Sequence, residues 1–251
     1  ELSNKREPTF SPENILESKV IFPDHISYQL HKVFRSKKGD SCIVFDGNNI
    51  EYLVRLEQVN STKTLGVVLE ETKCSREASV KLILYQALIK PDRFEYAIQK
   101  SVELGINKIV PLISERTEYQ VPSDSRMKRW QNIVRESSEQ SNRTILPTLE
   151  TPMAFNQALI ESPQNSIIPW EMEKNKGIKE FLHDIKDNLN DQLLELGIFI
   201  GPVGGFSEEE IKVATDNKVV PVSFGPRILR SETAGVVAAS VVLYEFDELK
   251  F

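Results

Sequence analysis

The sequence predicts an α/β protein in two parts, a small β-barrel domain with one helix followed by a larger domain built on a mostly parallel sheet. Two observations carry this prediction. Up to about residue 72, short runs rich in β-branched and aromatic residues alternate with turn signals. From about residue 78, strands alternate with amphipathic helices, a pattern typical of a parallel sheet covered on both faces. A polar stretch over 71–79 separates the two, and we place the domain boundary between residues 72 and 73.

The first part contains four expected strands and one expected helix. The strands cover 19–22, 41–46, 50–59 and 64–71. The sequence Asp46-Gly47-Asn48-Asn49 predicts a hairpin turn, because glycine and asparagine tolerate a positive φ. Apolar residues at helical spacing, Ile26, Leu30 and Val33, predict a helix over 25–35.

The second part alternates between the two kinds of element. We expect strands at 80–87, 108–113, 166–170, 197–200 and 219–224. We expect helices at 93–104, 123–142, 178–189 and 208–215, and a last helix from about Thr233. Gly105 ends the first of these helices, and Ser207 with Glu210 forms a capping box. Thr151 followed by Pro152 predicts the start of a further helix.

Charge is unevenly distributed along the 251 residues. The formal net charge is −6, which disfavours a protein held on nucleic acid or on an anionic membrane by bulk charge alone. Residues 1–72 carry a net −2, residues 73–145 a net +4 and residues 146–251 a net −8. The basic middle third is either a solvated helix face or a patch that meets phosphates.

Several classes of protein are disfavoured by the sequence. No apolar run approaches the roughly 20 residues of a membrane-spanning helix, and the N-terminus lacks the apolar core of a signal peptide. Cys42 and Cys74 are far apart and belong to no Cys/His cluster, and His31 and His183 have the wrong spacing for metal ligands. We therefore expect a cytoplasmic protein with no metal, no disulfide and no membrane partner.

Two unusual loops follow neighbouring strands of the second part. The glycine loop, Gly201–Ser207, brings three glycines that let the backbone approach a ligand. It matches neither a Walker A loop nor GxGxxG, so nothing points to a dinucleotide. The arginine loop, Phe224–Ala234, enters the last helix. Either loop alone fits a tight turn or a helix cap. Because ligands bind outside the carboxyl ends of parallel strands, the two together predict a ligand site.

These loops are accompanied by further motifs in a fixed order, and together they resemble the RsmE-type 16S ribosomal RNA N3-uridine methyltransferases of the SPOUT superfamily. The second part matches at Gln86–Lys90, Arg93–Glu95, Glu103–Gly105, Ile109–Leu112, Glu115-Arg116 and Glu139–Ser141. The first part matches at Pro12–Ile15, Gly39-Asp40 and Phe45–Gly47. The resemblance covers nearly the whole chain.

The resemblance implies a fold and an activity. Residues 1–72 would form a PUA-like β-barrel that helps to grip RNA, and residues 73–251 a SPOUT methyltransferase domain with a deep trefoil knot. The enzyme would use S-adenosyl-L-methionine to methylate N3 of a specific uridine in 16S rRNA of the small ribosomal subunit. It would act as a homodimer.

The same resemblance places S-adenosylmethionine between the two loops. The expected cofactor-binding residues are Trp170, Glu171, Ile200, Gly201, Pro202, Gly205, Phe224, Gly225, Ile228, Leu229, Arg230, Thr233 and Ala234. For catalysis, we expect Arg230 to stabilise negative charge that develops on the uracil. Glu232 either accepts the N3 proton or caps the last helix.

RNA is expected to contact a set of basic residues spread over the first two thirds of the chain. They are His31, Lys32, Arg35, Lys37, Lys38, Lys90, Arg93, Arg116, Arg126, Arg129 and Arg143. Each of them alone is as readily explained as a solvated side chain. As a cluster they favour RNA contact, and binding should weaken steeply with salt.

One position departs from the family pattern. The glycine loop of the family usually reads Gly-Pro-Glu-Gly-Gly, and here Val203 stands in the place of the glutamate. One alternative is therefore a catalytically weak or inactive RNA-binding or ribosome-assembly factor with the same fold. Another is a SPOUT methyltransferase that acts on a different RNA position.

Overall fold

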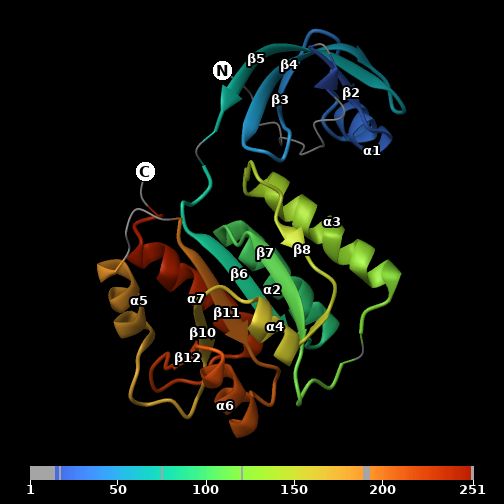
Figure 1. The fold of residues 1–251 in the computed structure, drawn as a ribbon. Helices are drawn as coiled ribbons and strands as arrows, with labels where there is room; N and C mark the ends of the chain where they lie inside the picture. Colours follow the sequence, from blue (N-terminus) through green and yellow to red (C-terminus); the bar gives the residue numbers. More distant parts are fainter. Residues whose placement is uncertain (1–14, 17, 75, 120, 189–192, 250–251) are drawn as a thin grey trace. The chain divides into compact units, whose positions relative to one another are not determined.

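A computed structural model describes residues 15–16, 18–74, 76–119, 121–188 and 193–249. The chain divides into two compact units (Figure 1). The first unit comprises residues 1–77 and 138–146, and the second comprises 78–137 and 147–251. Of the predicted features, the motif residues Pro12, Glu13 and Asn14 and the end of the helix expected over 178–189 lie outside the described residues.

The described part of the first unit holds a five-stranded antiparallel sheet in the order β1-β2-β5-β4-β3. The strands are β1 (Ile15–Leu16), β2 (Lys19–Phe22), β3 (Ser41–Phe45), β4 (Ile50–Val59) and β5 (Thr64–Lys73). The four strands expected from the sequence are confirmed. Positive φ values of 79° at Gly47 and 72° at Asn49 confirm the turn between β3 and β4.

The single helix expected in this unit has two parts. α1 (Asp24–Tyr28) continues as a π-helix, η2 (Gln29–Val33). The Phe34 N–H donates to the Gln29 carbonyl, a five-residue step instead of the four-residue step of an α-helix. Ile26 and Leu30 still face the core. The helix expected over 25–35 is therefore present over residues 24–33, and its second half is a π-helix, whose wider turn apolar spacing does not reveal.

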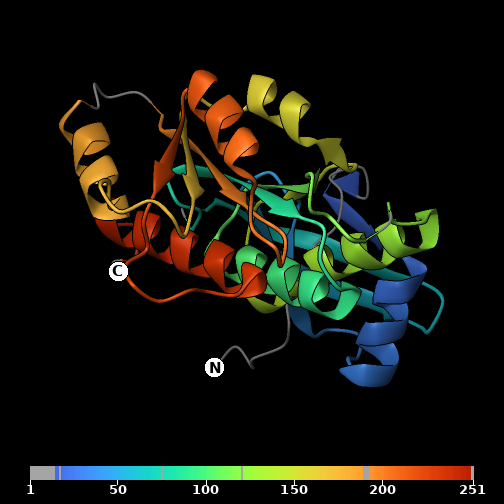
Figure 2. The same cartoon turned by 90° about the horizontal axis from the view of Figure 1, so that it is seen from below.

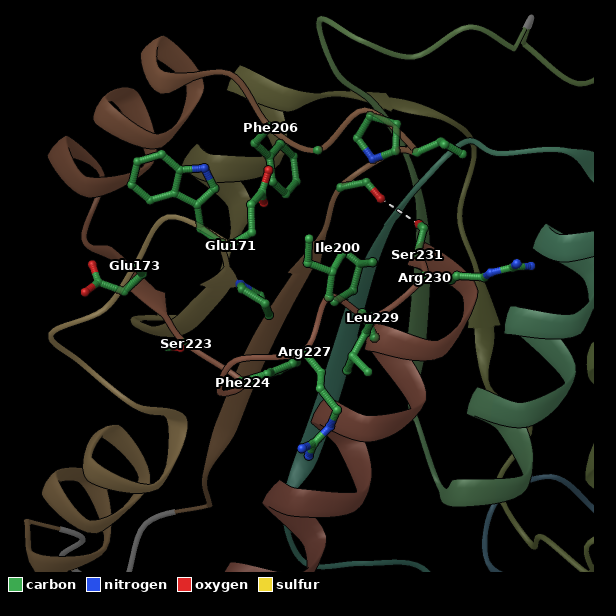
Figure 3. A pocket seen from close by; sticks show the side chains of 18 of the residues that line it. Glu171, Glu173, Ile200, Phe206, Ser223, Phe224, Arg227, Leu229, Arg230 and Ser231 are labelled. Carbon is green, nitrogen blue, oxygen red and sulfur yellow. Dashed lines mark hydrogen bonds between the residues drawn. The ribbon is translucent and has the colours of Figure 1, made fainter.

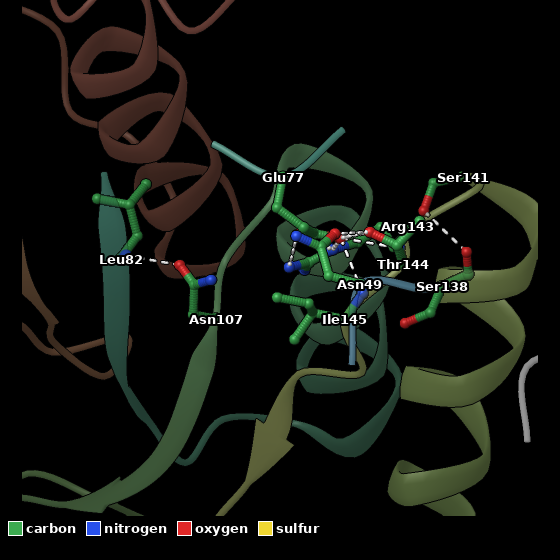
Figure 4. A network of polar contacts seen from close by, with 9 residues as sticks. All are labelled: Asn49, Glu77, Leu82, Asn107, Ser138, Ser141, Arg143, Thr144 and Ile145. Atoms are coloured by element: carbon green, nitrogen blue, oxygen red, sulfur yellow. Dashed lines mark hydrogen bonds and ion pairs between the residues drawn. The ribbon is translucent and has the colours of Figure 1, made fainter. Parts of the chain in front are cut away.

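A segment distant in sequence, residues 138–146, completes the first unit around Glu77 (Figure 4). The Glu77 carboxylate accepts hydrogen bonds from Arg143 Nη2 at 2.6 Å and from the backbone N–H groups of Thr144 and Ile145 at 2.9 and 3.0 Å. The Thr144 hydroxyl donates to Asn49 Oδ1 at 2.6 Å. The Arg143 and Glu77 side chains are only 5% and 8% exposed, so this is a buried ion pair. No sequence pattern indicated this return of the chain.

The second unit is built on a sheet whose described strand pairs are all parallel. The order is β12-β10-β11-β6-β7-β8, and β9 also pairs with β7. The strands are β6 (Lys81–Ala87), β7 (Lys108–Ile113), β8 (Thr148–Leu149), β9 (Met153–Ala154), β10 (Asn165–Pro169), β11 (Glu195–Ile200) and β12 (Val219–Val222). The parallel sheet expected from the alternating pattern is confirmed.

Helices cover both faces of this sheet (Figure 2). One core lies under α2 (Pro91–Leu104), α3 (Asp124–Gln140), α5 (Ile178–Asp187) and α7 (Ser231–Glu245). The other lies under α4 (Phe155–Glu161) and α6 (Glu208–Asp216). No helix in the described ranges is long and apolar enough to cross a membrane.

Most helix ends follow the local sequence signals. Gly105 caps α2 with a φ of 107°, and Ser207 and Glu210 form both hydrogen bonds of the capping box before α6. The helix start expected at Thr151-Pro152 was wrong. Met153 and Ala154 pair with β7 as a short strand, so α4 begins only at Phe155. The last helix begins two residues earlier than expected, with Arg230 as its N-cap.

Glu77 gives the first unit a defined acid sensitivity. Burial raises the pKa of the Glu77 carboxyl, but the hydrogen bonds and charge of Arg143 and the two backbone N–H groups outweigh burial and hold that pKa below its usual value. A lowered native pKa stabilises the fold above the pKa of the unfolded chain, about 4.3, and the stabilisation is lost as pH falls through the native value.

We therefore predict that Glu77→Gln lowers the free energy of unfolding at pH 7 by about 3 kcal/mol, the range for breaking a buried ion pair from one side. The deficit should shrink below about pH 4, where the wild-type protein loses the same interaction. Urea denaturation followed by circular dichroism measures both effects. Glu70→Gln, at an exposed position of β5, is the matched control. An equal deficit at pH 7 and pH 3.5 would contradict the prediction.

Candidate functional site

A pocket of about 830 Å³ lies at the carboxyl ends of β10, β11 and β12 (Figure 3). Three loops line it: the segment after β10, the glycine loop after β11 and the arginine loop after β12. Arg93, in the first turn of α2, completes the wall. The volume falls within the range of cavities that enclose a small-molecule ligand or a cofactor.

The loops meet because their strands are parallel and in register. In the register of the sheet, Ile167 of β10 lies beside Ile198 of β11 on one side and Val220 of β12 on the other. Parallel neighbours end at the same edge, so three chain segments that are well separated in sequence converge there. The two loops therefore line one pocket, but the strands that they follow are not the neighbours expected from the sequence, because β10 lies between β11 and β12.

The glycine loop presents backbone to the pocket, with little room for a Cβ at two of its glycines. A Cβ on Gly201 would lie 3.1 Å from the ring of Phe206. A Cβ on Gly205 would lie 2.9 Å from Glu171 Oε1, and the Gly205 φ of +68° already disfavours a side chain. At Gly205 the positive φ is the stronger constraint, because the Glu171 carboxylate is the mobile end of a side chain, and at Gly201 the Phe206 ring would have to move by a few tenths of an ångström.

The outer side of the glycine loop is anchored by the segment that follows β7. Arg116 Nη1 donates to the Gly204 carbonyl at 2.8 Å. The Ser207 hydroxyl donates to Glu115 Oε2 at 2.6 Å, and Glu210 Oε1 accepts from the Glu115 N–H. The Glu115-Arg116 motif is thus tied to the loop, a role that sequence reasoning missed when it assigned Arg116 to RNA.

Charges of both signs surround the pocket. The cations are Arg93, Lys174, Arg227 and Arg230, and the carboxylates are Glu171, Glu173 and Glu232. Backbone N–H groups of Asn175 and Lys176 bind Glu173 Oε1 and hold the pKa of its carboxyl below the usual value. A ligand that carries separate positive and negative groups would find partners for each.

The expected cofactor-binding residues gather at this pocket with one exception. Trp170, Glu171, Ile200, Gly201, Pro202, Gly205, Phe224, Gly225, Ile228, Leu229, Arg230 and Ala234 line it. Thr233 does not line it and is exposed on α7. Sequence reasoning missed Glu173 and Lys174, although their position just after β10 is itself a signal.

The two proposed catalytic residues lie at the start of α7. Arg230 is the N-cap, with an exposed side chain that points away from that of Arg227 (Figure 3). Glu232 lies in the first helical turn, is 12% exposed, and forms an ion pair with Arg93, Nε to Oε1 at 3.7 Å. Arg93, expected to contact RNA, is therefore the partner of Glu232 within the pocket wall.

The remaining basic candidates fall into two groups. In the first unit, Lys32, Arg35, Lys37 and Lys38 are exposed and His31 is half-buried. In the second, Lys90 pairs with Asp92, and Arg129 forms two hydrogen bonds of 2.7 Å with Glu95, whereas Arg126 is exposed. Arg143 is buried against Glu77, so it holds the first unit together and does not present its charge at the surface.

Metal-binding side chains do not cluster in the described part of the chain: no group of three His, Cys, Asp or Glu side chains has suitable geometry. Cys42 and Cys74 are both unbridged, and Cys42 is buried.

Comparisons with known proteins find RNA methyltransferases. The model of a family described as an RNA methyltransferase domain matches residues 76–243. A ribosomal RNA small subunit methyltransferase E from Mesomycoplasma hyopneumoniae is 35% identical over 210 residues, which cover 82% of this chain and 86% of that protein.

Two solved structures match nearly the whole chain. One is a putative methyltransferase from Legionella pneumophila in complex with the bound cofactor SAM, with a TM-score of 0.83, 28% identity, and coverage of 96% of this chain and 97% of that one. The other is a ribosomal RNA small subunit methyltransferase E from Neisseria gonorrhoeae bound to S-adenosyl methionine, with a TM-score of 0.82, 28% identity, and coverage of 95% and 97%.

Proposed function

This chain belongs to the RNA methyltransferase family, and we propose that it transfers a methyl group from S-adenosylmethionine to N3 of a uridine in 16S ribosomal RNA. The observation that carries the proposal is the pocket at the ends of β10, β11 and β12. It is bounded by the two loops on which the sequence resemblance rests. The near full-length similarity to small subunit methyltransferases supports the choice of ribosomal RNA.

The pocket residues suit the proposed cofactor. S-adenosylmethionine carries a carboxylate, an ammonium and a sulfonium, and the pocket offers both cationic and anionic side chains. The glycine loop approaches with bare backbone at Gly201 and Gly205, where an added Cβ would lie in tight contact with Phe206 or Glu171. Ile200 and Leu229 supply apolar surface for a flat ring. When bound, the cofactor supplies a methyl group on an electron-poor sulfur.

The reaction requires loss of the uridine N3 proton and attack by the nitrogen on the methyl carbon as the bond from carbon to sulfur breaks. The chain's residues act on the uracil. The Arg230 guanidinium stabilises negative charge on the ring. Glu232, held by Arg93, is positioned to take the N3 proton or to stabilise the first turn of α7. Holding both partners in attack geometry supplies much of the acceleration.

The proposal extends to the parts of the chain. Residues 1–72 would act as a PUA-like barrel that grips RNA, and residues 73–251 as a SPOUT domain in which the arginine loop belongs to a trefoil knot. We also infer a homodimer, supported by large apolar side chains that this chain leaves exposed, such as Ile228 at 86% and Tyr244 at 75%. A ribosomal substrate implies action in the cytoplasm.

A direct transfer assay tests the function. Tritiated S-adenosylmethionine is incubated with the protein and small ribosomal subunits that lack the modification, followed by mapping of the labelled base. We expect one labelled uridine, methylated at N3. Label at another position would support a SPOUT enzyme with a different target. Binding of subunits and cofactor without label would support an assembly factor that lost turnover with Val203.

We predict that Arg230→Ala lowers the rate of methyl transfer at least about 100-fold, the typical effect of removing one stabiliser of developing charge. Its affinity for S-adenosylmethionine should stay close to wild type, because the cofactor has further contacts along both loops. Single-turnover transfer and calorimetry measure the two quantities. Lys212→Ala, on α6 and outside the pocket, is the control. Unchanged turnover would remove Arg230 from the mechanism.

RNA binding should depend most on the exposed cations between η2 and β3. We predict that a Lys37→Glu/Lys38→Glu variant binds ribosomal RNA more weakly. The plot of log affinity against log salt should become less steep, by about one unit of slope for each phosphate that the variant no longer neutralises. Filter binding over a salt series measures the slope. Lys179→Glu/Lys212→Glu makes the same change of charge at exposed positions of α5 and α6. Equal weakening in both variants would indicate an effect of net charge only.

A further inference from the structure

A chain of hydrogen bonds lies beneath the glycine loop and joins three segments of the pocket wall. Gln86 Nε2 donates to the Ser231 hydroxyl oxygen at 2.9 Å. That hydroxyl in turn donates to the Gly201 carbonyl at 2.6 Å, the bond drawn as a dashed line in Figure 3. Gln86 lies on β6 beside Ile200 of β11, Gly201 follows β11, and Ser231 is the first residue of α7. The end of one strand, the glycine loop and the start of α7 are thereby coupled.

The direction of this chain is set by chemistry. A serine hydroxyl has one proton, and its oxygen can accept while that proton is donated elsewhere. Because the Gln86 amide nitrogen can only donate, the Ser231 oxygen accepts from it, and the Ser231 proton is available to Gly201. A carboxamide oxygen at the same place would compete for that proton. Gln86 therefore orients the hydroxyl that holds the loop.

The burial of Gln86 fits an orienting role. The residue is 1% exposed, and its Oε1 has no hydrogen-bond partner among the described residues. An orphaned buried acceptor is unfavourable. Turning the amide to satisfy that oxygen would remove the donor from Ser231. The structure thus keeps an unsatisfied oxygen next to a well-formed hydrogen bond to Ser231.

A hydrogen bond to the Gly201 carbonyl can fix the conformation of the glycine loop. The next residue is Pro202, which has no N–H, so the peptide between them offers the carbonyl as its only polar group. Gly201 has no side chain to fix its conformation. The Ser231 hydroxyl thereby fixes the plane of this peptide at the floor of the pocket.

We propose that Ser231 and Gln86 are positioning residues that pre-form the glycine loop for S-adenosylmethionine, with Ser231 holding the Gly201 carbonyl and Gln86 orienting Ser231. The identity of the ligand rests on the proposed function. Neither residue takes part in proton or methyl transfer. Their loss should therefore raise the KM for S-adenosylmethionine and leave kcat at saturating cofactor close to wild type.

The test compares three serine variants. Ser231→Ala removes the hydroxyl, and we expect its Kd for S-adenosylmethionine in calorimetry to rise about tenfold, in the range for one missing hydrogen bond. Ser231→Thr keeps a hydroxyl and should restore most of the affinity. Ser240→Ala makes the same change further along α7, where the hydroxyl bonds to Val236, and should bind like wild type. Thermal melts of each variant report on folding.

A second variant tests the orienting step. Gln86→Met keeps the size and burial of the side chain but removes its donor, and we expect a smaller rise in Kd than for Ser231→Ala. If wild type binds S-adenosylmethionine and Ser231→Ala binds equally well, the positioning role is wrong while the proposed function stands. If wild type itself does not bind, the proposed function fails first. A lowered melting temperature with unchanged Kd would assign Ser231 and Gln86 to stability alone.

Discussion

The pocket depends on the parallel pairing of β10, β11 and β12. Parallel strands cannot be joined by a tight turn at one edge, so each must return across a face of the sheet, and every segment that follows a strand emerges at the same edge. Three segments that are distant in sequence are thereby brought to one place. An antiparallel arrangement of the same three strands would put the segment after β10 at the opposite edge from the glycine loop and the arginine loop, because β10 lies between β11 and β12.

Three functional side chains of the pocket lie next to one another in sequence at the start of α7. Three consecutive residues have three different environments: Arg230 is open to the pocket, Ser231 binds the Gly201 carbonyl, and Glu232 pairs with Arg93. Gly201 and Arg93 belong to other segments of the wall. A small shift of this helix end would move the loop and the carboxylate together, because Ser231 binds the loop and Glu232 carries the carboxylate.

Local signals were sufficient where a local interaction decides the structure. The capping box at Ser207 and the left-handed cap at Gly105 form as their sequences indicate. Local signals were insufficient where a residue distant in sequence determines the structure. Thr151-Pro152 is a good helix start by itself, but pairing of the next residues with β7 delays α4. Arg143 was interpreted as a surface cation because nothing local reveals that Glu77, 66 residues earlier, buries it.

The same distinction bears on how an acidic chain would hold RNA under the proposed function. A cation already bound to a carboxylate must give up that partner before it gains a phosphate, so the net gain is small, whereas an unpaired cation releases counterions at no such cost. Arg129 on Glu95 and Arg93 on Glu232 belong to the first kind. The exposed cations of residues 32–38 have no carboxylate within ion-pair distance among the described residues. Affinity for RNA should therefore follow this short segment more closely than the net charge of −6.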